Sequence, residues 1–171
     1  MVGSYDEVIT TREKGIMGDR TTITIITESR EDKLNVGISV YIHHGGRACV
    51  DAALEATRPY VEGTMGAEFA TLQEQPERLT TAIVHKLYES GDYAEPWNVY
   101  LTPVAGTRED LIAFAQGDDH ASVTIDIPNG LIVVRDEVEE TNYGIAWGNM
   151  DKIYRVVDAV EKKHQYFDNR A

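Results

Sequence analysis

The residues best suited to chemistry stand together where a predicted strand runs into a predicted helix. His43 and His44 are followed there by Gly45, Gly46 and Arg47. Glycines let the backbone turn with a positive φ and let a ligand approach closely. The start of a helix offers unpaired N–H groups and the positive end of its dipole, and an arginine adds a planar donor fork. This junction therefore predicts a site for an anion such as phosphate or carboxylate.

Further side chains complete the predicted anion pocket. Arg20 precedes the first predicted strand, and Tyr41 lies in the second. If these strands pair as an antiparallel hairpin, Arg20 and Arg47 lie at the same end of the sheet and can converge. Tyr41 and His43 share one strand face, where they can stack on a base or donate to a phosphate. The predicted ligand-binding residues are Arg20, Tyr41, His43, Gly45, Gly46 and Arg47.

A hydrolase is an alternative function for the same part of the chain. Pairs of histidine and carboxylate do general acid–base work and leave little trace in a sequence. The candidate catalytic residues for cleavage of a phosphoester are His43, Asp119 and His120. The chain has no nucleophile elbow, Walker motif or dinucleotide fingerprint, and its dispersed histidines predict no metal site and no cofactor. We favour a binding protein over an enzyme.

The composition and net charge of the chain indicate which classes of binding partner are disfavoured. The chain has 171 residues, a formal net charge of −13 and one cysteine. Such a charge disfavours binding to duplex nucleic acid or to an anionic membrane, because both attract cations. An acidic surface can instead dock on a basic protein, so a third hypothesis is an inhibitor of another protein. The sequence shows neither a signal peptide nor an apolar run long enough for a bilayer, so we expect a cytoplasmic location.

Several strands are expected to position the site. Alternating β-branched residues predict strands over residues 19–27 and 36–43, which pair as a hairpin. Further strands are predicted over residues 97–101 and 143–147. The dipeptide Asn129-Gly130 between two β-prone runs predicts a second hairpin, formed by residues 122–128 and 131–135.

Helices are expected in separate blocks. They are predicted over residues 47–57, where Pro59 should end the helix, from Pro76 to about residue 90, after the N-cap Thr107, and over residues 150–167. We predict an α+β fold, with a mainly antiparallel sheet, helices packed on one face and a C-terminal helix. Residues 1–18 are expected to be a flexible leader, and residues 19–171 a single domain.

Two short motifs flank the first predicted hairpin. The chain carries Met17-Gly18-Asp19-Arg20 before it and Tyr41-Ile42-His43-His44-Gly45-Gly46 at its end. This combination resembles small proteins encoded by tailed bacteriophages, in which a Met-Gly-Asp-Arg start precedes a strand end of the form Tyr-x-His-Trp-Gly-Gly. His44 stands where those proteins have tryptophan. The element Asp118-Asp119-His120 before the Asn129-Gly130 hairpin is similar to the later part of the same pattern.

The resemblance extends over residues 17–135 and implies a role rather than a reaction. The family has no established activity. The resemblance implies a viral accessory protein that is made in the cytoplasm of an infected bacterium and counteracts host defence. Such a protein would bind a small signalling molecule or a host factor. The partners expected are therefore a small anionic ligand or a host protein, and a homo-oligomer is left open.

Overall fold

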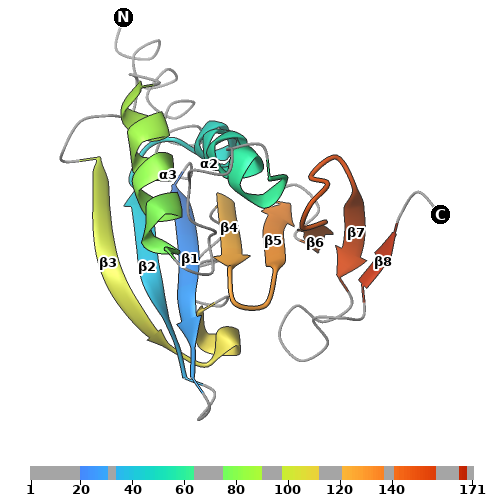
Figure 1. Ribbon diagram of the computed structural model, residues 1–171. Helices are drawn as coiled ribbons and strands as arrows, with labels where there is room; N and C mark the ends of the chain where they lie inside the picture. The colour runs from blue at the N-terminus through green and yellow to red at the C-terminus, as the bar shows by residue number, and fades with distance from the viewer. Residues whose placement is uncertain are drawn as a thin grey trace, which may run out of the picture.

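A single sheet organises the part of the chain that the structure describes (Figure 1). The computed structural model describes residues 20–30, 34–63, 75–89, 98–111, 121–136, 141–156 and 166–168. Within these ranges the sheet has eight strands, and two long helices cover one of its faces. This arrangement confirms the predicted α+β class. The expected leader, residues 1–18, lies outside the described residues.

The strands form two antiparallel blocks that meet at one parallel seam. Their bounds are β1 Thr21–Ser29, β2 Asn35–Ile42, β3 Val99–Gly106, β4 Ala121–Asp126, β5 Leu131–Asp136, β6 Thr141–Ile145, β7 Ile153–Val156 and β8 Tyr166–Asp168. Across the sheet they follow the order β3-β2-β1-β4-β5-β6-β7-β8. Only β1 and β4 run parallel among the described strands. The seam therefore lies near the middle of the sheet.

The first predicted hairpin is confirmed. Strands β1 and β2 pair antiparallel, with Thr22 opposite Tyr41 and Ile23 opposite Val40. Isoleucine, valine and threonine suit a pleated surface because their branched side chains pack well across strands. The alternation also separates the two faces, since successive side chains of a strand point to opposite sides.

The second predicted hairpin is confirmed, with a longer turn than expected. Asp126 of β4 pairs with Leu131 of β5, so four residues, 127–130, connect the strands. The Gly130 N–H donates to the Ile127 carbonyl at 3.2 Å, and Gly130 has a φ of 60°. The Asp126 carboxylate also accepts the backbone N–H of Asn129. This local hydrogen bonding favours the four-residue connection over a two-residue Asn-Gly turn.

The two helices pack on each other and over the seam. They are α2 Arg47–Val61 and α3 Glu77–Glu89. The predicted stop of α2 at Pro59 is wrong, because a proline in the last turn removes only one N–H. An ion pair between Arg58 and Glu62 at 3.2 Å and the burial of Val61 stabilise the extra turn. In the described part of the chain, no helix has the length and apolar composition needed to cross a membrane.

The hydrophobic core lies between the sheet and these helices. From the sheet it contains Ile23, Ile25, Val40, Ile42, Val123, Ile125, Ile132 and Val134. From the helices it contains Cys49, Val50, Ala52, Ala53, Leu79, Ile83 and Leu87. Small residues on α2 let that helix lie close to the strands. This core fixes which side chains of each strand point away from the helices.

The predicted C-terminal helix over residues 150–167 is not confirmed, because both of its described ends contain strands, while residues 157–165 lie outside the described residues. Strand β7 lies within that range and pairs with β6, with Ile153 opposite Ile145. Strand β8 occupies its end. The helical spacing of Ile153, Val156, Val157 and Val160 was the basis of the prediction. β-Branched residues have low helix propensity, and pairing with an existing strand edge overrides such a pattern.

Candidate anion-binding site

The second face of the sheet, opposite the helices, carries polar side chains at its centre. It includes Thr22 and Thr24 of β1, Ser39 and Tyr41 of β2, and Ser122 and Thr124 of β4, which alternate with core residues. We call this side the polar face. The hydroxyls of Thr24 and Ser39 lie 3.3 Å apart, and all the threonines and serines in this set are buried. The polar face therefore offers hydrogen-bonding groups in a setting from which water is largely excluded.

Three of the predicted ligand-binding residues meet at one end of the polar face. Thr21 pairs with Ile42, so the next position along each strand places Arg20 opposite His43. Alternation puts both on the same face as Tyr41. The Tyr41 and His43 rings lie 6.3 Å apart between centroids. The charge of Arg20 lowers the pKa of both side chains. Arg20, Tyr41 and His43 thus form one cluster, which we call the Arg20 cluster.

Arg20 is partly buried, and one nitrogen of its guanidinium is not satisfied by its surroundings. Its Nε is buried and has no hydrogen-bond partner in the part of the chain that the structure describes. An arginine is positively charged at any physiological pH. Burying an N–H donor of a guanidinium without a partner is costly, and the cost is recovered when an anion accepts its hydrogen bond. This side chain is the strongest sign of a ligand in the described structure.

The other two members of the cluster are neutral at pH 7. Partial burial, together with repulsion from His44 and Arg20, holds the pKa of His43 below its ordinary value. Burial raises the pKa of the Tyr41 phenol, and Arg20 offsets part of that rise. The site therefore combines one permanent cation with two neutral groups that can donate hydrogen bonds.

Asn98 clamps the strand end that carries the two histidines. The His43 N–H donates to the Asn98 carbonyl at 2.8 Å. The Asn98 side chain accepts the His44 N–H at 2.7 Å and donates to the His44 carbonyl at 3.0 Å. Asn98 was not among the predicted site residues, because nothing in the sequence shows which residue lies beside β2. The clamp fixes the backbone from which His43 projects.

The two glycines of the junction serve the fold. A Cβ built on Gly45 would lie 2.2 Å from Cys49 Sγ and 2.9 Å from Ile42 Cγ2, so core side chains already fill that space. Gly46 has a φ of 59° and precedes the first residue of α2. Its carbonyl accepts a hydrogen bond of 2.6 Å from the Thr21 hydroxyl. Packing and backbone conformation explain both glycines without a ligand.

The Arg47 side chain does not join the Arg20 cluster but has other partners. Its guanidinium donates to Asp51 at 3.1 Å and to the Tyr143 hydroxyl at 2.8 Å. Tyr143 lies in β6, which three strand-to-strand steps separate from β1. The predicted convergence of Arg20 and Arg47 is therefore not seen, because the helix that carries Arg47 lies on the opposite face of the sheet.

The predicted hydrolase site cannot be assembled from the described residues. His43 belongs to the Arg20 cluster, whereas Asp119 and His120 lie outside the described residues. Within the described residues, no group of three or more histidine, cysteine or acidic side chains is arranged to hold a metal ion. The acid–base hypothesis stays a prediction.

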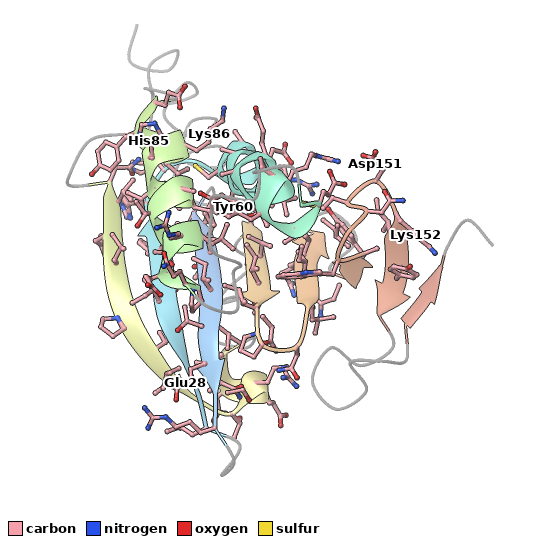
Figure 2. The ribbon with its side chains drawn as sticks, viewed as in Figure 1. Glu28, Tyr60, His85, Lys86, Asp151 and Lys152 are labelled. Atoms are coloured by element: carbon pink, nitrogen blue, oxygen red, sulfur yellow. The ribbon has the colours of Figure 1, made fainter. Side chains whose placement is uncertain are left out.

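A groove lies between α2 and α3. It has a volume of about 460 Å³, and Figure 2 shows Tyr60, His85 and Lys86 around it. Its charged side chains already have partners. Lys86 pairs with Glu55 at 3.2 Å, and His85 lies 3.5 Å from Glu89. The groove therefore offers less to an anion than the Arg20 cluster does.

The comparisons with known proteins add no functional assignment. No protein-family model, no curated protein and no solved structure matches the chain. The resemblance to bacteriophage proteins and a role against host defence therefore stay predictions.

Proposed function

We propose that this protein binds a small anionic ligand at the Arg20 cluster. The observation that carries the proposal is the buried Arg20 Nε, which lacks a hydrogen-bond partner among the described residues. Phosphate and carboxylate oxygens are the natural acceptors for a guanidinium. Tyr41 and His43 lie beside it as neutral donors, so the cluster can add hydrogen bonds without adding charge.

The surroundings of the cluster suit a small ligand rather than a nucleic-acid duplex. The chain as a whole carries a net charge of −13, which repels a polyanion at long range. A compact anion meets that repulsion only weakly at physiological ionic strength, because screening limits it to about 8 Å. The backbone clamp of Asn98 on His44 holds the site in place before the ligand arrives, which lowers the entropy lost on binding.

The direct test is calorimetric titration of inorganic phosphate into the protein and into the variant Arg20→Met. A hydrogen bond to a charged group contributes about 1.5–3 kcal/mol, so the dissociation constant should rise about 10- to 100-fold in the variant. Methionine keeps an unbranched apolar stem while removing the guanidinium and its charge, so the fold should be retained.

A matched control is Arg30→Met. Arg30 follows the other end of β1 and pairs with Glu28, which Figure 2 labels there. Both side chains are more than half exposed, so this variant should bind phosphate as the unmodified protein does. Equal binding by Arg20→Met and the unmodified protein would contradict the proposal, and so would failure of the unmodified protein to bind phosphate.

A further inference from the structure

Tyr100 is an exposed aromatic side chain next to the Arg20 cluster. It lies in β3 directly opposite Tyr41, and the two rings are 4.9 Å apart between centroids with an interplanar angle of 36°. The Tyr41 ring is partly buried, whereas Tyr100 is 50% exposed. The preceding residues Asn98 and Val99 are 2% and 5% exposed. Tyr100 therefore stands at the point where the buried strand end opens to solvent.

We infer that the anionic ligand also carries a planar ring, which stacks on Tyr100, and that the ligand class is therefore a nucleotide. This inference rests on the proposed anion site. Aromatic side chains bind nucleobases through their faces, with little regard to which base is present. Tyr41 supports the Tyr100 ring from the neighbouring strand, so the aromatic surface is held in place before a base arrives.

The spacing between the two groups suits a mononucleotide. Arg20 and Tyr100 are separated by two strand-to-strand steps, since β2 lies between β1 and β3. Along the strand direction they are offset by two residues. Standard sheet spacings put their Cα atoms roughly 12 Å from each other. The long arginine side chain and the tyrosine ring each shorten that gap. His43 lies between them, where it can donate to the sugar or the phosphate.

Titration of three phosphate compounds separates this inference from the proposed function. The probes are inorganic phosphate, ribose 5-phosphate and adenosine monophosphate. The unmodified protein should bind adenosine monophosphate about 5- to 100-fold more tightly than ribose 5-phosphate, which is the range for one stacked base. In Tyr100→Ala this preference should vanish while the affinity for ribose 5-phosphate stays the same. Tyr100→Phe should keep the preference, because the ring is what matters.

Leu101→Ala is the matched control. Leu101 is the next residue of β3, is 48% exposed and points to the opposite face of the sheet. Its loss should leave all three affinities unchanged. Equal affinity of the unmodified protein for adenosine monophosphate and ribose 5-phosphate overturns the stacking inference and leaves the anion site standing. Binding of none of the three compounds overturns both. Retention of the preference in Tyr100→Ala overturns the assignment of Tyr100.

Discussion

Two arginines reach opposite ends of the polar face, and their surroundings differ. Arg108 donates to Asp126 at 2.6 Å, and Asn129 also donates to that carboxylate from its backbone and its side chain. By contrast, the Nε of Arg20 has no hydrogen-bond partner in the described part of the chain. The chain thus pairs the charge at one end with its own residues, whereas our proposal assigns the unpartnered nitrogen at the other end to a ligand. The difference is that between a structural ion pair and the binding site that we propose.

The largest effect is expected at the paired end. Asp126→Asn removes the charge partner of Arg108, and the two side chains are only 1% and 14% exposed. Leaving a buried charge without its partner should lower the free energy of unfolding by about 3–5 kcal/mol. Urea denaturation measures this loss. Asp151→Asn is the control, because Asp151 is 78% exposed in its pair with Arg58 and should change stability by less than about 1 kcal/mol. Similar losses in both variants would mean that the buried ion pair contributes no more to the free energy of unfolding than the exposed pair does.

A smaller effect is expected when the open end is made to resemble the paired end. His43→Glu places a carboxylate opposite Arg20 across β1 and β2. A cross-strand pair of opposite charges should raise the free energy of unfolding by about 0.2–1 kcal/mol. The same carboxylate should abolish phosphate binding, because it occupies the arginine and repels the anion. Phosphate binding that persists in this variant would show that the ligand does not use Arg20.

The smallest effect concerns the protonation of His43. The pKa of His43 in the free protein is lowered by burial, His44 and Arg20, so protonation is disfavoured in the folded state. Stability should therefore fall as the pH drops below about 6.5, the ordinary pKa of histidine. Bound sulfate, whose charge is constant over this range, should raise the pKa of His43 and weaken that fall.

Proton NMR of the histidine rings, assigned with the variant His43→Gln, measures this change with and without sulfate. A His43 pKa that sulfate leaves unchanged would place the anion away from this residue.

Local contacts made much of the fold predictable. Both hairpins connect neighbouring segments, and their β-branched alternation and turn residues are visible in the sequence. The parallel pairing of β1 with β4 was not predicted, because no local pattern specifies which distant strand covers an open edge. The helix predicted over residues 150–167 shows the reverse case, in which a local pattern is present but strand pairing overrides it. Ile153 and Val156 follow a helical spacing, but β7 pairs with β6 and forms a strand.

The sequence predicts only those parts of the candidate site that lie on one strand or within one hairpin. Alternation alone places Tyr41 and His43 on one face, and the hairpin brings Arg20 beside them. Asn98 and Tyr100 belong to the same site through the pairing of β2 with β3, which joins segments far apart in the sequence. Arg47 does not converge with Arg20 but donates to Tyr143, whose position depends on the pairing of the whole sheet. To identify side-chain partners across the sheet, one must know the register of the paired strands. No local sequence pattern specifies that register.

The parallel seam also sets the order of events when the chain folds. Ile23 pairs with Val123, one hundred positions later. During synthesis, β1 can pair with β2 long before β4 exists, so its other edge stays uncovered until Ala121–Asp126 have been made. An uncovered edge rich in isoleucine is a template for pairing between chains. Closing so distant a contact is also entropically slow. Yield of native protein should therefore depend on how quickly the second half of each chain reaches the first.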